Sequence, residues 1–209
     1  KYGGTAVELD SQRDIGRYVI GDWKIDIATQ IGNNLAEDLM RRDFSINSIA
    51  LEITSNPCLL DPAGGLNDLK EKKLVAISEK NLIDDPLRIL RGFRLTSELN
   101  LEIDKQTLYF FQKNANLLNQ VAVERIRIEI EKLIGGDWFD DVIPLLKKIN
   151  LLEPWKENIN EYKFNFRSLN NVSSFRASEL KLALPLVRLM YLLSEDGLVK
   201  LGFSKKIIK

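Results

Sequence analysis

Histidine is absent from the 209-residue chain, and cysteine occurs once, at Cys58. Without histidine, neither a serine–histidine nucleophile nor a histidine-ligated zinc site can form. A single cysteine permits no internal disulfide and is typical of a reducing compartment, so we expect a cytoplasmic protein. No run approaches the roughly 20 apolar residues that span a bilayer, so no membrane partner is expected.

An excess of either charge is also lacking, because 30 Lys and Arg balance 30 Asp and Glu. Bulk charge therefore gives no attraction to nucleic acid, and any RNA contact must come from local patches. The length suits one large domain or two small ones. The chain begins with Lys1 and shows no signal-peptide pattern, so we expect a piece of a longer protein.

Strand and turn signals fill the first 80 residues. In "RYVIGDWKIDIA", Gly21-Asp22 separates two β-rich runs, which predicts a hairpin. In the second run the apolar residues Trp23, Ile25 and Ile27 share one face, so Asp26 projects from the other. We also predict a short helix over 34–42, a strand over 48–53, and a strand end followed by a loop over 58–69.

Helical signals dominate from about residue 84. Pro86 suits the first position of a helix in "DDPLRILRGFRLTSEL". Asp84, Arg88 and Arg91 fall at i, i+4 and i+7, which predicts that they share one side. An ordinary surface helix with salt bridges remains an alternative.

Later segments are also predicted to be helical. Residues 123–134 fit both a strand and a helix, and their Arg, Glu and Lys content favours the helix. A polar loop is expected around 156–174. In the final helix Ser178 is a candidate cap, and Pro185 is expected to kink or split it.

The segment "EDLMRRDFSINSIALEI" (37–53) mixes charged and apolar residues unusually closely. Arg42 and Asp43 are adjacent, while Phe44, Ile46 and Ile49 alternate with polar neighbours. A solvated helix face would not need these apolar residues, and a core element would not tolerate the charges. The pattern indicates a polar site built against a packed wall, with a buried ion pair that braces strand against helix as the alternative.

Four segments occur in a fixed order: "RRDFSIN" (41–47), "LLDPAGGLNDL" (59–69), "DDPLRILRGFR" (84–94) and "ERIRIEIEKL" (124–133). Together they resemble the class II tRNA nucleotidyltransferases, which comprise the CCA-adding enzymes and their bacterial poly(A) polymerase relatives. The resemblance covers about residues 6–150. It implies an α+β fold: a partial nucleotidyltransferase head with a small mixed β-sheet (1–80), a helical neck that recognises the nucleotide (81–150), and a helical body where a tRNA-binding region starts (151–209).

The resemblance also implies an activity. It predicts template-independent addition of C and/or A to tRNA 3′ ends from CTP or ATP with Mg²⁺. The family's G-G-x-V-R-D and D-x-D segments do not occur in the chain, so the fragment alone is expected to be inactive. Asp26 is then a candidate third carboxylate for the metal, with a solvent-facing strand residue as the alternative. A bacterial poly(A) polymerase and a non-catalytic RNA-binding relative remain alternative functions.

The "RRDFSIN" segment resembles the family's ribose and phosphate motif. Arg42 would then offer a fork of donors to phosphate oxygens. Asp43 would accept hydrogen bonds from ribose hydroxyls, and Asn47 would both donate and accept. Phe44 and Ile46 would anchor the segment.

In "DDPLRILR" the resemblance assigns base reading to Asp85 and Arg88. Asp84 replaces the family's usual Glu, and Arg91 would brace Asp85 or reach phosphate. Supporting roles are expected elsewhere: Asp61 would order a turn whose glycines, Gly64 and Gly65, permit hinge movement. Two further residues would stabilise the base-reading helix, Glu124 and Arg125.

Overall fold

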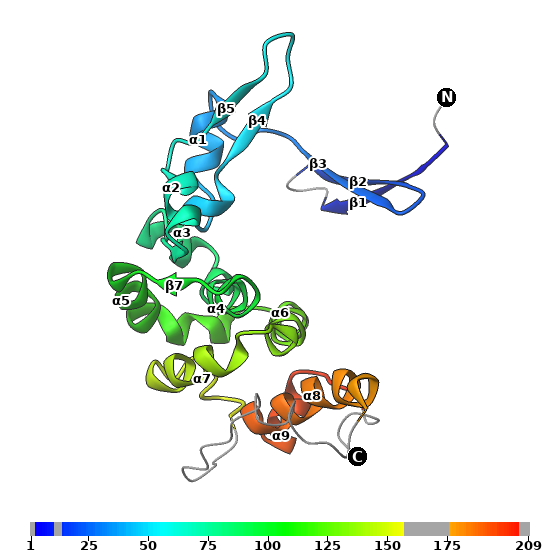
Figure 1. The fold of residues 1–209 in the computed structure, drawn as a ribbon, viewed down its shortest axis with the longest axis vertical. Helices are drawn as coiled ribbons and strands as arrows, with labels where there is room; N and C mark the ends of the chain where they lie inside the picture. The colour runs from blue at the N-terminus through cyan, green and yellow to red at the C-terminus, as the bar shows by residue number, and fades with distance from the viewer. Residues whose placement is uncertain (1–2, 11–13, 157–175, 205–209) are drawn as a thin grey trace.

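The computed structural model describes residues 3–10, 14–156 and 176–204. It has an α+β fold in which small sheets come first and helices follow (Figure 1). The chain opens with an antiparallel sheet in the order β1 (Thr5–Asp10), β2 (Ile15–Ile20) and β3 (Trp23–Ala28). The predicted hairpin is confirmed: β2 pairs with β3, and Gly21 has the positive φ of +55° that such a tight turn requires.

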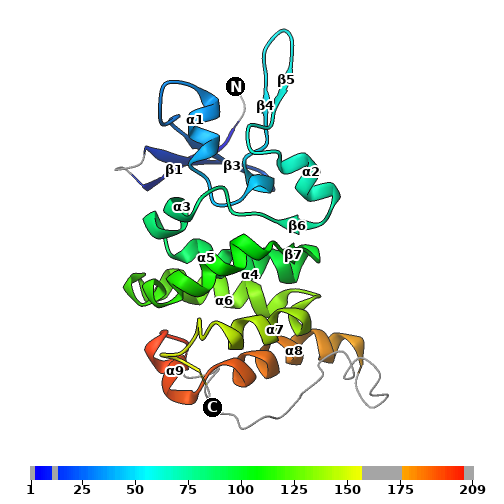
Figure 2. The same cartoon turned by 90° about the vertical axis from the view of Figure 1, so that its left-hand side faces the viewer.

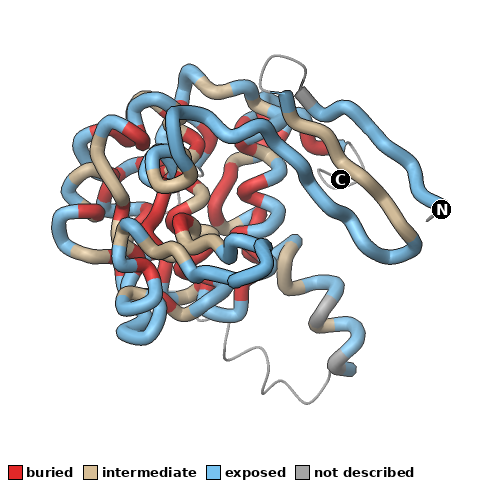
Figure 3. The backbone as a smooth tube through the Cα atoms, turned by 90° about the horizontal axis from the view of Figure 1, so that it is seen from above, coloured by how far each residue is buried: buried red, intermediate tan, exposed pale blue. Residues whose placement is uncertain are grey.

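The apolar face of β3 lies open to solvent. Trp23 is 76% exposed and Ile27 62%, although the alternation predicted that they would line the apolar side of an amphipathic strand. The sheet extends away from the helical part of the molecule (Figures 1 and 3). The apolar and polar residues of β3 therefore alternate between the two faces as predicted, but no described element covers the apolar face.

Shorter elements connect this sheet to the helices. They are α1 (Leu35–Met40), the 3₁₀ turn η1 (Ser45–Asn47), β4 (Ala50–Glu52), β5 (Cys58–Leu60) and α2 (Gly65–Lys70), with β4 and β5 antiparallel. The predicted helix over 34–42 and strand over 48–53 are confirmed within a few residues. The predicted loop over 58–69 is wrong at its end, where α2 begins.

Asp61 is the reason that a helix begins at Gly65. Its carboxylate accepts the backbone N–H groups of Gly65 at 2.7 Å and Leu66 at 2.9 Å, which satisfies amides that a helix start leaves free. Gly65 is buried, and a Cβ there would collide with the backbone carbonyl of Ser45. Gly65 therefore permits close packing, and a hinge at this position is not supported.

The remaining elements are mostly helices stacked in successive layers (Figure 2). They are α3 (Glu79–Asp84), α4 (Leu87–Leu99), α5 (Lys105–Asn114), the 3₁₀ helix η2 (Ala115–Gln120), α6 (Val123–Gly135), α7 (Phe139–Lys148), α8 (Ala177–Leu192) and α9 (Glu195–Lys200). The strands β6 (Lys73–Leu74) and β7 (Glu102–Ile103) form a parallel pair. No helix of the described residues is long and apolar enough to cross a bilayer.

Helix α3 was not predicted, and it changes the position of Asp84. Ser78 caps it by accepting the backbone N–H of Asn81 at 3.1 Å. Asp84 is its last residue, and Asp85 is extended with φ −144° and ψ 92° before Pro86. Because a proline disfavours helical geometry in the residue before it, α3 ends and α4 starts anew. The spacing predicted that Asp84 shares a helix face with Arg88 and Arg91. This prediction is wrong, because Asp84 belongs to a different helix.

The other helical predictions have mixed outcomes. Residues 123–134 are helical, with Ile126, Ile130 and Leu133 buried. The final helix α8 continues through Pro185 without a break, and it begins after Arg176, so Ser178 lies inside it. A proline removes one backbone hydrogen bond, and the buried residues that follow it keep the helix intact. The predicted loop over 156–174 lies, except for its first residue, outside the described residues.

The core joins the segment after α1 to the helices. Phe44 is fully buried and meets Phe111 edge-on, with ring centroids 6.1 Å apart. Phe93 lies 5.4 Å from the same ring. A Cβ on Gly92 would lie 2.5 Å from Phe111 and 2.9 Å from Phe44, so this glycine lets α4 approach both rings. Phe44 thus anchors its segment, as the sequence predicted.

Candidate nucleotide-binding site

The RRD segment, residues 41–47, brings Asp43 and Asn47 together. Asp43 is 4% exposed, and its Oδ1 accepts the Phe44 backbone N–H at 2.9 Å and Asn47 Nδ2 at 3.0 Å. Arg91 Nη2 of α4 forms an ion pair with Asp43 Oδ2 at 3.1 Å. Asp43 therefore braces α4, as the alternative reading of this segment proposed, while it also orients the Asn47 amide.

Arg42 has a looser environment. Its Nη1 lies 3.5 Å from the Asn47 carbonyl oxygen and its Nη2 3.6 Å from Asp38 Oδ2, at the long end of such contacts. The Arg42 side chain is 51% exposed. A guanidinium held this weakly can turn toward an anionic ligand at little cost.

Asp85 sits between α3 and α4 with its two oxygens in different situations. Its Oδ2 accepts Arg125 Nη2 from the first turn of α6 at 2.8 Å. Its Oδ1 is buried and has no hydrogen-bond partner among the described residues. Since buried polar atoms are nearly always hydrogen-bonded, Oδ1 is an acceptor that lacks a donor.

Arg88 lies one turn into α4 and is oriented by backbone carbonyls. Its Nη1 donates to the Arg41 carbonyl at 2.8 Å and to the Asn81 carbonyl at 3.0 Å. Burial lowers the pKa of Arg88, while the carboxylates of Asp43 and Asp85 oppose that shift. The remaining N–H groups of this guanidinium have no partner among the described residues, so they can serve a ligand.

The structure thus brings together five predicted site residues: Asp43, Asn47, Asp85, Arg88 and Arg91. The predicted supporting role of Arg125 agrees with its ion pair to Asp85. Of the other predicted residues, Asp84 acts on Arg88 only through its charge. Asp84 and Glu124 are exposed, and Asp61 caps α2.

Asp26 lies on β3, away from this cluster. Arg17 on the neighbouring strand donates to both of its oxygens, at 2.6 and 2.8 Å. These hydrogen bonds hold the pKa of the Asp26 carboxyl below its usual value. Among the described residues, no group of three or more acidic, histidine or cysteine side chains is placed to hold a metal ion. We therefore assign no step to a metal held by the described residues alone.

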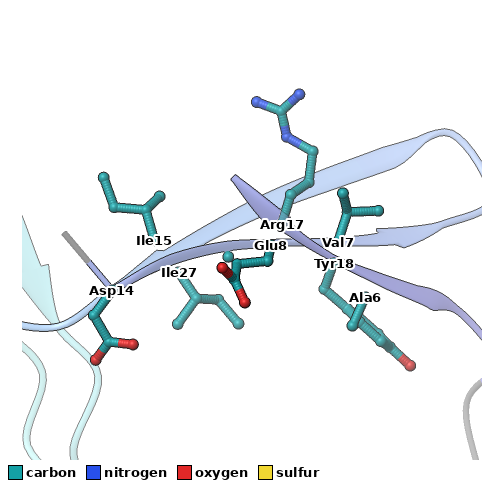
Figure 4. Close-up of a pocket in the computed structure, with 9 residues that line it drawn as sticks. Ala6, Val7, Glu8, Asp14, Ile15, Arg17, Tyr18 and Ile27 are labelled. Carbon is teal, nitrogen blue, oxygen red and sulfur yellow. The ribbon is translucent and has the colours of Figure 1, made fainter. Parts of the chain in front are cut away.

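A shallow hollow of about 360 Å³ on the sheet is separate from this cluster. Figure 4 shows Val7, Ile15 and Arg17 on one side of the sheet and Tyr18 and Ile27 on the other. Side chains that point to both sides of a single sheet do not converge on one ligand. The hollow is therefore not a candidate site.

Sequence reasoning missed Asn81, which is 8% exposed and contacts the RRD segment. Its Nδ2 donates to the carbonyl oxygens of Met40 at 2.9 Å and Arg42 at 2.7 Å. Its acceptors are backbone atoms, which no residue pattern reveals. The helix that contains Asn81 was not predicted either, so the sequence pattern did not mark this residue as part of the site.

Two family models match parts of this α+β chain. The family profile described as "Poly A polymerase head domain" matches residues 17–75. A second profile, "Probable RNA and SrmB-binding site of polymerase A", matches residues 100–163. Over these two ranges the chain is similar to the class II tRNA nucleotidyltransferases and poly(A) polymerases.

Curated relatives carry related names. The chain is 32% identical over 187 residues to a CC-adding tRNA nucleotidyltransferase of Synechocystis sp., covering 88% of the chain and 42% of that protein. It is 42% identical over 139 residues to a CCA-adding enzyme of Streptococcus uberis, covering 63% of the chain and 34% of that protein. The chain thus spans less than half the length of these relatives.

Solved structures agree with this fold. A tRNA-processing enzyme in an apo form aligns over 99% of the chain and 60% of its own, with a TM-score of 0.80 and 25% identity. The Thermotoga maritima CCA-adding enzyme complexed with tRNA aligns over 98% of the chain and 53% of its own, with a TM-score of 0.72 and 23% identity. At that identity the second likeness concerns the fold alone.

Proposed function

We propose that the chain is the nucleotide-recognition part of an RNA nucleotidyltransferase that adds C and/or A to tRNA 3′ ends from CTP or ATP. The observation that carries this proposal is the buried Asp85 Oδ1, an acceptor without a donor, next to the partly free guanidinium of Arg88. Such a pair offers one acceptor and one donor to a planar ligand.

The hydrogen-bonding pattern explains the choice of base. A carboxylate only accepts and a guanidinium only donates. Cytosine and adenine present an amino donor beside a ring-nitrogen acceptor, which matches Asp85 and Arg88. Uracil and guanine present a carbonyl acceptor beside an N–H donor, so both contacts would be mismatched. A site built around such groups rejects mismatched ligands by on the order of 10⁴.

The neighbouring residues suit the rest of a nucleotide. The Asn47 amide, oriented by Asp43, would bind ribose hydroxyls, and the loosely held Arg42 would bind phosphate. The names of the relatives support tRNA as the acceptor of the new nucleotide. We propose Mg²⁺ as the cofactor of the whole protein, a cytoplasmic location, and the division into head (1–80), neck (81–150) and body (151–209). Asp26 remains a proposed third carboxylate.

The test measures nucleotide incorporation by the whole protein. The primers are tRNAs that lack CCA, CA or the final A, each offered one NTP at a time with Mg²⁺. We expect CTP or ATP to be used and UTP and GTP to be rejected. Asp85→Ala and Arg88→Ala should remove the preference or the activity, because each deletes one half of the donor–acceptor pair.

Asp84→Ala is the matched control, because this neighbouring carboxylate is exposed. It should keep the base preference. The primer that is extended identifies the step that the protein performs. If the well-folded whole protein incorporates no nucleotide, the enzymatic proposal is wrong and a non-catalytic RNA-binding relative remains.

Poly(A) addition is a second candidate, favoured by the two poly(A) polymerase profiles. The same assay separates it. Repeated AMP addition to an RNA without tRNA structure would indicate a poly(A) polymerase, whereas addition that stops at a completed CCA end would exclude it.

A further inference from the structure

Asn81 joins two parts of the candidate site. It lies within α3, and its Nδ2 donates to the carbonyl oxygens of Met40 at 2.9 Å and Arg42 at 2.7 Å. Met40 is the last residue of α1 and Arg42 is the second residue beyond it, where a helix leaves its last carbonyl groups without partners. The Asn81 side chain therefore fixes the start of the RRD segment to α3.

The backbone of Asn81 makes the second connection. Its carbonyl accepts Arg88 Nη1 at 3.0 Å, and the same Nη1 donates to the Arg41 carbonyl at 2.8 Å. Asn81 and Arg88 together thus hold three successive carbonyl groups, those of residues 40–42. One N–H of Arg88 Nη1 is directed at the RRD segment and the other at the Asn81 carbonyl. The orientation of the Arg88 guanidinium therefore depends on where Asn81 and the RRD segment lie.

We propose that Asn81 is a positioning residue that sets the RRD segment and Arg88 at a fixed separation for the incoming nucleotide. The inference rests on the proposed function, in which the RRD segment binds ribose and phosphate and Arg88 reads the base. One nucleotide must contact both parts at once. A misplacement of about 1 Å in such a site lowers the rate about a hundredfold.

The test compares Asn81→Leu with the wild type in the whole protein, because leucine has the same branched shape and number of side-chain heavy atoms but no donor. We expect kcat/KM for CTP and ATP to fall about tenfold to a hundredfold. UTP use should fall less, so the preference for CTP over UTP should shrink. KM for tRNA should stay unchanged, because the primer is not held by these contacts.

Asn114→Leu is the matched control. Asn114 is 7% exposed, and its Nδ2 also donates two hydrogen bonds, to Glu79 Oε1 and the Phe110 carbonyl, both at 2.9 Å. The two variants lose the same number of bonds from similarly buried sites, so both should lose thermal stability. Only Asn81→Leu should lose base preference. If the two variants show the same preference as the wild type, the proposed role of Asn81 is wrong.

A second variant covers the case in which Asn81→Leu does not fold. Asn81→Ser introduces a smaller polar side chain that cannot clash with the core, and its short hydroxyl does not reach both carbonyls. A folded Asn81→Ser protein with wild-type kcat/KM and base preference would also overturn the proposal. Incorporation by the wild type tests the proposed function itself, so its absence refutes that function, whereas an unaffected variant of an active wild type refutes only the role of Asn81.

Discussion

Arg94 forms the most buried ion pair described between α4 and α6. Its Nε lies 2.7 Å from Glu129 Oε2, and its Nη1 lies 2.6 Å from Glu98 Oε2. The side chains of Arg94 and Glu129 are only 15% and 9% exposed. A charge that is buried this deeply needs its partner, because water cannot replace it. This pair therefore fixes how the helix that carries Arg88 and Arg91 lies on α6.

We expect Arg94→Met to lower the free energy of unfolding by about 3–5 kcal/mol, because it leaves the buried Glu129 carboxylate with only the Lys132 ammonium at 3.4 Å, whose side chain is 51% exposed. Replacing Glu129 by Met as well should recover most of the loss. Urea denaturation measures both. Lys200→Met is the control, since its pair with Asp196 is exposed and should contribute less than about 1 kcal/mol. An Arg94→Met protein as stable as the wild type would contradict this account.

At the scale of residues, the sequence predicted the members of the site better than their contacts. Asp43, Asn47, Asp85 and Arg88 were singled out through a family resemblance, and the structure brings them together. It did not reveal that Arg88 is held by backbone carbonyls, because carbonyl groups belong to every residue type. The roles of these residues in binding remain predictions.

The C-terminal ends of α4 and α6 are in contact. Ser97 of α4 is fully buried; its Oγ donates to the Leu133 carbonyl at 3.0 Å, and its own carbonyl accepts the Trp138 N–H at 2.9 Å. A Cβ on Gly136 would lie 2.6 Å from the Ser97 carbonyl oxygen. The absence of a side chain at this position lets the two helix ends meet.

Two adjacent glycines test this contact. Gly136→Ala should destabilise the protein by about 1–3 kcal/mol, because the new methyl group displaces Ser97. Gly135→Ala should be neutral or slightly stabilising, since nothing lies within 4 Å of its Cβ position and alanine favours the helix. Thermal unfolding of both variants measures the difference. Equal effects at the two positions would show that the contact with Ser97 does not limit the packing.

The elements themselves were predicted unevenly. Residues 123–134 gave the correct helix because their Arg, Glu and Lys residues favour it, since the apolar spacing alone fitted both a strand and a helix. The six-residue helices α2 and α3 were missed. Their starts depend on the caps Asp61 and Ser78, and two turns are too short for a periodic pattern to stand out.

Over the whole molecule, burial is concentrated in the helical part and the segment that Phe44 anchors to it. Figure 3 shows buried positions gathered there and only exposed and intermediate positions along the first sheet. Every residue of β3 is exposed, whereas α4 is buried along most of its length. Alternating residues predicted a face for the sheet to bury, but alternation alone does not say what covers that face.

Backbone amides of β2 and β3 should exchange with solvent much faster than those of α4 and α6, because few apolar contacts oppose local opening of the sheet. Hydrogen exchange measured on the 209-residue chain tests this. The short strands β6 and β7 are the control: the Asp104 N–H donates to the carbonyl of buried Leu74 at 3.1 Å and should be protected. Equal protection of β3 and α4 would show that the sheet is held more firmly than its exposure indicates.

The junction that joins the end of α1 to α3 and α4 has a consequence for comparing related sequences. Met40, Arg41 and Arg42 take part in it only through carbonyl oxygens, which every amino acid supplies. Substitutions at those three positions leave the acceptors in place, whereas the donors Asn81 and Arg88 cannot be exchanged freely. Positions that change together in evolution report contacts between two side chains. Residues 40–42 would therefore not covary with Asn81 and Arg88 in related sequences. Only the two donor positions, Asn81 and Arg88, would be restricted in the residues they accept.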